Sequence, residues 1–198
     1  AALGFHGEAS SVDWDYHCAG NGAMARIEMD VQLVRSPFVL KREVFIESGS
    51  LTIRVRETIV NQSDDALHAM WGHHPAFATK LLTGGRFETR AHIFESHAPD
   101  ISATARVAAG TVHSWPLVTG KDGRQIDLSY LPEDGQRLSE MGYLSDFEEG
   151  RFVLSNDSLG LAAELCWDTK MFPHLWYWLE WEGSSEYPWY GRSRVAAF

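Results

Sequence analysis

Cysteine is scarce in this sequence, with two residues among 198. Cys18 and Cys166 are far apart and form neither a CxxC pair nor a framework of closely spaced bridges. We interpret them as free thiols in a reducing compartment, which predicts a cytoplasmic protein. A single long-range disulfide stays open as the alternative.

Long apolar runs and N-terminal targeting features are also missing. The hydrophobic stretches are short and interrupted, so none is long enough to cross a bilayer. The first residues lack the charged start and apolar stretch of a signal peptide. Hydrophobic residues make up 44% of the chain and charged residues 22%, which favours a soluble globular class over a disordered one.

Positive charge is low, with 17 Lys and Arg against 27 Asp and Glu, for a formal net charge of -10. An acidic surface repels phosphate backbones and anionic lipid. The charge therefore argues against nucleic-acid and membrane partners. Nothing in the sequence indicates an oligomeric state.

Helical periodicity is absent as well, and alternating, β-branched segments take its place, separated by Gly, Pro, Asn, Asp or Ser turns. Between residues 51 and 59, apolar and polar residues alternate, which predicts one buried and one solvated face. Ser48–Ser50 predicts a hairpin loop before this strand. Only Leu138–Asp146 is expected to form a turn of helix. The predicted strands are Arg26–Val34, Val39–Glu47, Leu51–Asn61, Leu67–His74, Phe87–Phe94, Thr104–Ala109, Arg151–Asn156, Leu161–Trp167 and His174–Glu182.

These strands predict an all-β fold, a large antiparallel β-sandwich with little helix. No internal repeat or low-complexity linker interrupts the chain, so a single domain over 1–198 is the simplest organisation. Residues 194–198 have the pattern of a strand up to the last residue, and a sandwich cut there would expose an unpaired edge. We therefore expect a fragment of a longer domain, truncated at the N-terminus and slightly at the C-terminus.

Tryptophan and histidine are abundant, with eight and nine residues, and they cluster. Aromatic rings stack on the C–H faces of sugars, and histidines move protons near neutral pH. A tryptophan-rich core is the simpler interpretation by composition alone.

The first cluster ends a predicted strand at Pro75. Strand alternation places His74 on one face and the adjacent His73 on the other, together with Trp71. Because proline stops a strand ladder, His74 would stand at the end of a sheet, where sites are often built. A pair of surface or core histidines is the alternative.

The second cluster is the segment 174–182. Alternation places Trp176, Trp178 and Glu180 on one face, so the two tryptophans are predicted to line a cleft beside the carboxylate. Partial desolvation raises the pKa of a carboxylate toward the range of a general base. An aromatic core strand with acids at its exposed end is the equally open alternative.

Three motifs resemble the aldose 1-epimerase (galactose mutarotase-like) superfamily, and the similarity runs along most of the chain. His74-Pro75-Ala76-Phe77 resembles the family's His-x-(Tyr/Ala)-Phe motif, and Leu179-Glu180-Trp181 resembles its late Leu-Glu-Pro-type segment. His6-Gly7-Glu8, followed by Trp14, resembles its early His-Gly segment. The order and spacing of the motifs agree with the family as well as the residue types.

The resemblance implies an isomerase that interconverts the α and β anomers of an aldose, with His74 as general acid and Glu180 as general base. It implies that His6 helps to hold the sugar and that no metal or other cofactor is required. For the family's sugar-binding aspartate the candidates are Asp146 and, after it, Asp127. The family's sugar-binding arginine has no counterpart here, and Trp181 stands where many members have proline. These departures indicate a divergent branch and leave the sugar and its phosphorylation open.

Three other functions compete with this one. A non-catalytic carbohydrate-binding or sugar-sensing protein on the same fold would not need His74 and Glu180, which are both present. A cupin-like metal enzyme needs a His-x-His pair on one strand face, whereas His73 and His74 are adjacent and diverge. A glycoside hydrolase needs two opposed carboxylates, whereas Glu180 and Glu182 share a strand face.

Overall fold

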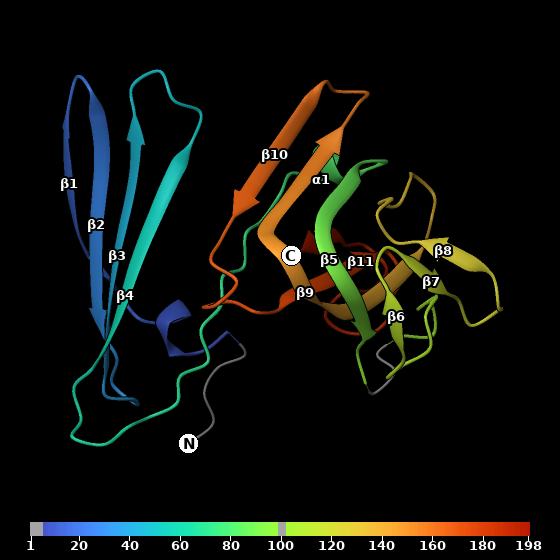
Figure 1. Cartoon of the computed structure of the whole chain (residues 1–198), viewed down its shortest axis with the longest axis horizontal. Helices are drawn as coiled ribbons and strands as arrows, with labels where there is room; N and C mark the ends of the chain where they lie inside the picture. The colour runs from blue at the N-terminus through green and yellow to red at the C-terminus, as the bar shows by residue number, and fades with distance from the viewer. Residues whose placement is uncertain (1–5, 99–101) are drawn as a thin grey trace. The chain divides into compact units, whose positions relative to one another are not determined.

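The computed structural model describes residues 6–98 and 102–198 (Figure 1). The chain divides into two compact units, Ala1–Met70 and Trp71–Phe198. The single domain expected over 1–198 stays a prediction.

The first unit is one antiparallel sheet, coloured blue to cyan in Figure 1. The hairpin loop predicted at Ser48–Ser50 is confirmed between its last two strands, where the Ser50 N–H donates to the Glu47 carbonyl at 3.0 Å. Gly49 in this loop has a φ of 77°, a conformation that favours glycine. The elements, in sheet order after a 3-10 turn η1 (Glu8–Ser10), are β1 (Asp15–Asn21), β2 (Met24–Gln32), β3 (Phe38–Glu47) and β4 (Ile53–Asn61).

The two faces of this sheet differ in polarity. Ile27, Val44 and Val55 are paired across β2, β3 and β4, so they share an apolar face. On the opposite face, Glu43 forms ion pairs with Arg26 at 2.7 Å and Arg56 at 3.0 Å. The predicted alternation is therefore confirmed, but the predicted burial is not, because Val55 is 52% exposed. One sheet has no second layer of its own to cover an apolar face.

The second unit is built on a six-stranded antiparallel sheet. Its order is β12 (Arg194–Ala197), β11 (Leu175–Trp181), β9 (Leu138–Asn156), β5 (Arg86–Ser96) and β6 (Val112–Ser114), and β10 (Leu161–Cys166) also pairs with β9. The hairpin β7 (Leu117–Thr119) to β8 (Gln125–Asp127) forms a separate two-stranded sheet. The only α-helix of the described residues, α1 (Thr79–Leu82), is a single turn.

Strand β9 has neighbours on both edges. Its first part pairs with β11, its last part pairs with β10, and β5 pairs with both parts. The register of β5 shifts between Thr89 and Ala91, and β9 bends sharply (Figure 1). The turn of helix predicted over Leu138–Asp146 is therefore wrong. Two partner strands satisfy the backbone of this segment, and that tertiary pairing overrides a weak local helical preference.

The core of the second unit lies against one face of β11. Leu175, Tyr177, Leu179 and Trp181 alternate along the strand and are all buried. The Tyr177 hydroxyl is satisfied inside the core, where it donates to the Leu128 carbonyl at 2.8 Å. Alternation along 174–182, which places Trp176, Trp178 and Glu180 on one face, predicts that these four residues share the other, and this prediction is confirmed.

Two predicted strands are wrong. Residues 67–74 form no strand, and Pro75, which follows them, cannot donate to a ladder. Residues 104–109 form no strand either, apart from one isolated bridge between Val107 and Gly120. The Arg106 N–H there donates to the buried Glu140 carboxylate at 3.0 Å instead of to a neighbouring strand.

The fold class predicted from the sequence, all-β of the antiparallel sandwich type with little helix, is confirmed. The strand pattern predicted for residues 194–198 corresponds to β12. None of the described helices has the length and apolar character that a membrane span requires.

Gly142 on β9 provides a test of the core. A Cβ at this position would lie 2.4 Å from the Phe94 ring and 2.7 Å from the Glu95 carbonyl oxygen. We expect Gly142→Ala to lower the free energy of unfolding by about 1–3 kcal/mol, the usual cost of overpacking. Gly72→Ala is the control, because a Cβ there meets no atom within 4 Å. Equal thermal stabilities of the two variants would contradict the packing described for Phe94.

Candidate functional site

The outer face of β11 carries the second cluster of candidate residues. Trp176 is 51% exposed, and Trp178 is half-buried on the same face. Each tryptophan has an aromatic neighbour, since Trp176 lies 5.6 Å from Tyr143 of β9 and Trp178 lies 5.2 Å from Trp189, between ring centroids. The predicted shared face of Trp176, Trp178 and Glu180 is confirmed, and it is an aromatic surface.

Glu180 is more deeply buried than the sequence predicts, with 1% of its surface exposed. The N–H groups of Gly183 and Ser184 donate to Oε1 at 2.9 and 3.0 Å. The Ser184 hydroxyl donates to Oε2 at 2.6 Å. Both carboxylate oxygens therefore hold the turn that follows β11, and the three donors satisfy this buried polar group.

His74 lies in an irregular segment and is exposed. Trp71 and His73 both pack against the Phe172 ring, at 5.5 and 5.6 Å between ring centroids. Trp71 and His73 therefore lie on the same side of the segment. This supports the prediction that His73 and His74 point to opposite faces, although the predicted strand does not form.

The chain returns to the sheet two residues after His74. Ala76 bridges Ala197 of β12, and Ala197 pairs with Trp178 of β11. Ala76, Ala197 and Trp178 thus form one row across the sheet. His74 precedes this row by two residues, close to the outer edge of β12.

The two other predicted sugar-binding residues, His6 and Asp146, lie in different units. His6 is exposed and belongs to the first unit. In the motif that follows it, Glu8 accepts bonds from the N–H groups of Val34 and Arg35 at 2.7 and 2.8 Å, so this glutamate holds a loop of the first unit. Asp146 lies on β9 with a φ of 56° and contacts His92 of β5, not the tryptophans.

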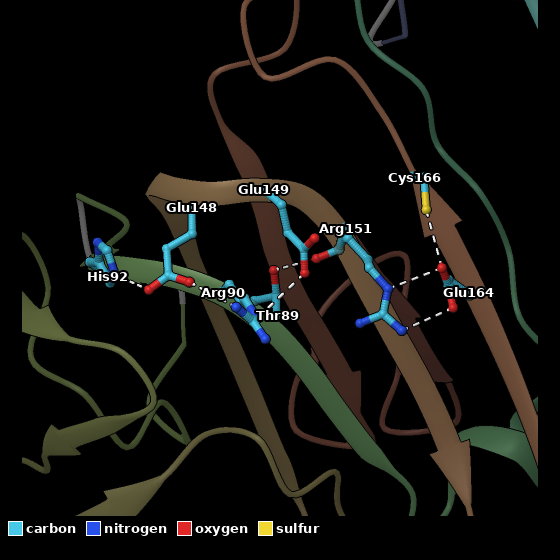
Figure 2. A network of polar contacts seen from close by, with 8 residues as sticks. All are labelled: Thr89, Arg90, His92, Glu148, Glu149, Arg151, Glu164 and Cys166. Atoms are coloured by element: carbon cyan, nitrogen blue, oxygen red, sulfur yellow. Dashed lines mark hydrogen bonds and ion pairs between the residues drawn. The ribbon is translucent and has the colours of Figure 1, made fainter.

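Asp146 is joined through His92 to a charged network on β5 and β9 that the sequence does not indicate. Figure 2 shows Arg90, His92 and Glu148 of this network. His92 has Asp146 at 3.2 Å from Nδ1 and Glu148 at 3.3 Å from Nε2. Glu148 first and Asp146 second raise the pKa of His92 above its usual value of 6.5. Arg90 donates to Glu148 at 3.0 Å, and this bond first and His92 second lower the pKa of Glu148. Sequence patterns miss the network because it depends on the register of two distant strands.

The same network lines a cavity of about 440 Å³ along β5, together with Trp115 and Asp127. Asp127, the second candidate for a sugar-binding aspartate, accepts bonds from the N–H and hydroxyl of Ser129 at 2.9 and 2.6 Å. Neither Trp176 nor Trp178 lines this cavity. Asp127 and the tryptophans therefore do not form one site.

Cys166, at the other end of Figure 2, is a free and exposed thiol. Its Sγ donates to Glu164 at 3.3 Å, and Glu164 is held in turn by two bonds of 3.0 Å from Arg151. Desolvation first and Glu164 second raise the pKa of Cys166. A raised pKa disfavours the thiolate, so this cysteine is not an activated nucleophile.

Within residues 6–98 and 102–198, no three His, Cys, Asp or Glu side chains are arranged to hold a metal ion. A scan against protein-family models gives no match, and searches of curated proteins and of solved structures find no similar protein. The aromatic face of β11 and the segment of His74 are therefore interpreted on their own geometry.

Removal of the Glu180 carboxylate should destabilise the turn after β11. Glu180→Ala leaves the part-buried N–H groups of Gly183 and Ser184 without their acceptor, at up to about 1–3 kcal/mol for each group. Ser184→Ala removes only the hydroxyl bond and should cost less. Ser185→Ala, an exposed neighbour, is the control. Chemical denaturation measures the three variants, and a Glu180→Ala protein as stable as the Ser185→Ala protein would contradict the role assigned to this carboxylate.

The charged network predicts how the stability of the fold depends on pH. A raised folded-state pKa of His92 contributes stability that is complete below its usual value of 6.5 and is lost as pH rises through the folded-state value. The lowered pKa of Glu148 contributes stability above its usual 4.5 that is lost as pH falls through the folded-state value. The network therefore stabilises the fold most in mildly acidic solution.

NMR titration of the His92 ring in variants tests how much each carboxylate raises the pKa of His92. We expect Glu148→Gln to lower the pKa of His92 more than Asp146→Asn, because the hydrogen bond with Glu148 is the largest single cause of its rise. Glu88→Gln, which removes a β5 carboxylate paired with Arg86, serves as the control. An unchanged pKa of His92 in Glu148→Gln would rule out the contact.

Proposed function

We propose that this chain is an aldose 1-epimerase-like protein that binds a sugar on the outer face of β11. The observation that supports this proposal best is the exposure of Trp176 on a strand whose opposite face is fully core. A large aromatic ring left in solvent on a rigid strand offers the flat apolar surface on which a sugar ring stacks. The motifs around His74 and Glu180 supply the two proton-transfer groups of the proposed reaction.

The proposed reaction opens and recloses the sugar ring. Glu180 accepts the proton of the anomeric hydroxyl while His74 donates a proton to the ring oxygen, so the bond between the anomeric carbon and the ring oxygen breaks and a carbonyl forms. Rotation about the adjacent carbon–carbon bond and the reverse transfers give the other anomer. The steps balance without a metal or redox cofactor, and their rate depends on the placement and proton affinity of the two side chains.

The bonds of Glu180 favour a second candidate function. Glu180 is 1% exposed and its two oxygens already accept three hydrogen bonds, so a base role requires the sugar to reach the remaining acceptor site of Oε2, which also binds the Ser184 hydroxyl at 2.6 Å. A carboxylate that stays bonded to its turn leaves a sugar-binding protein without catalysis. Both candidates place the sugar on the same face, and they differ only in whether anomers are exchanged.

The experiment follows anomer interconversion by NMR for a panel of aldoses. Glu180→Gln and His74→Asn should each lower turnover by about two to four orders of magnitude, with effects far from additive and with much smaller losses of sugar affinity. His73→Asn is the matched control and should stay near wild type, because His73 packs on Phe172. Circular dichroism confirms that each variant is folded.

The outcomes separate the candidates. Sugar binding with anomer exchange that neither substitution slows would remove the two catalytic roles. Sugar binding with no exchange in the wild type would establish the sugar-binding protein instead. An essential His73 and a dispensable His74 would place the motif one residue out of register.

The proposed location is the cytoplasm, which suits the two free thiols Cys18 and Cys166. The proposed partner is a small-molecule sugar, in keeping with a chain of formal charge -10 that repels nucleic acid and anionic lipid.

A further inference from the structure

The aromatic surface of β11 is wider than one sugar ring requires. Trp176 and Trp178 are two residues apart on one strand face, which separates their attachment points by about 7 Å. Each belongs to a different aromatic pair. Tyr143 meets the Trp176 ring edge to face, at an interplanar angle of 82°, and Trp189 is tilted by 51° against Trp178. The two pairs therefore stand side by side along the strand and offer two stacking positions.

We name Tyr143, Trp176, Trp178 and Trp189 the platform. The core on the opposite face of β11 holds the platform rigid. Trp176 and Trp178 alternate with core residues of β11, so their backbone cannot move without disturbing the core. The ring of Tyr143 is held at its far end by a 2.6 Å hydrogen bond between its hydroxyl and Nδ1 of His97. Rings that are already fixed lose little conformational entropy when a ligand binds them.

Charge near the platform selects the kind of sugar. The Glu95 carboxylate lies close enough to Tyr143 to contribute, after desolvation, to the raised pKa of that hydroxyl. Glu95 pairs directly with Tyr143 between β5 and β9, so it lies on the platform's side of the sheet. A fixed negative charge beside the stacking positions, on a chain of net charge -10, repels uronic acids and sugar phosphates.

We propose that the platform binds a neutral oligosaccharide, with two consecutive sugar rings stacked on the Tyr143–Trp176 and Trp178–Trp189 pairs. This inference rests on the proposed function and names its substrate class: the sugar that enters the site is the end of a neutral glycan, not a free or phosphorylated monosaccharide.

Isothermal titration calorimetry with neutral glucans and galactans of one to five units tests the proposal. The dissociation constant should fall by about two- to tenfold from the monosaccharide to the disaccharide and then level off, because a disaccharide fills both stacking positions. A single added aromatic contact is expected to change affinity by about two- to tenfold. Glucose 6-phosphate and an oligogalacturonide should bind more weakly than their neutral counterparts.

Variants locate the effect on the platform. Trp176→Ala and Trp189→Ala each remove a ring from a different pair and should abolish most of the gain with length. Tyr130→Ala is the matched control, because Tyr130 is an aromatic residue, 56% exposed, that lies outside the platform. Thermal unfolding of each variant shows whether a lost gain reflects lost folding, and Tyr143→Phe, which keeps the ring, should retain the length dependence.

The results also separate this inference from the proposed function. Equal affinity for all chain lengths, or full length dependence in both tryptophan variants, overturns the inference even if anomer exchange is observed. Length-dependent binding without anomer exchange supports the inference and overturns the catalytic function. Stronger binding of the charged sugars overturns the assignment of a neutral glycan.

Discussion

The second unit depends on the backbone pairing of β9 (Leu138–Asn156), which has hydrogen-bonded neighbours on both of its edges. A strand in the middle of a sheet satisfies its N–H and C=O groups on both sides, and it fixes which side chains of its neighbours share a face. Through this pairing, β9 places Tyr143 beside Trp176, and its contact with β5 assembles the charged network around His92. The aromatic surface and the ionic network thus both follow from the pairing of one strand, β9, with its two neighbours.

The faces of β11 illustrate what a sequence can predict. Alternation in the segment 174–182 assigns Leu175 and Tyr177 to one side and Trp176 and Trp178 to the other, and the structure agrees. Local patterns fail for Leu138–Asp146, predicted as a turn of helix, and for residues 67–74, predicted as a strand. Whether a segment forms a strand also depends on neighbours that lie far away in the sequence. In residues 104–109, a buried carboxylate from β9 takes the hydrogen bond that a partner strand would have taken.

The environment of Glu180 was beyond the reach of sequence patterns for a related reason. Its face could be predicted, but its burial depends on the turn after β11, in which Glu182 has a φ of 51° and Ser184 comes back to the carboxylate. Such a turn is a matter of backbone conformation, and the residue types alone do not specify it. The candidate base consequently has a structural role that is certain in the fold and a chemical role that is proposed.

The exposed apolar face of the first unit has a consequence for expressing that unit by itself. Of its described hydrophobic residues only Val31 is buried, and the row of Ile27, Val44 and Val55 gathers apolar side chains on one side of a single sheet. Protein stability comes mainly from burying such side chains, and an open face of this kind invites association with other apolar surfaces. A compact unit does not have to fold on its own: residues 1–70 expressed alone would expose this apolar face and are expected to associate with other apolar surfaces.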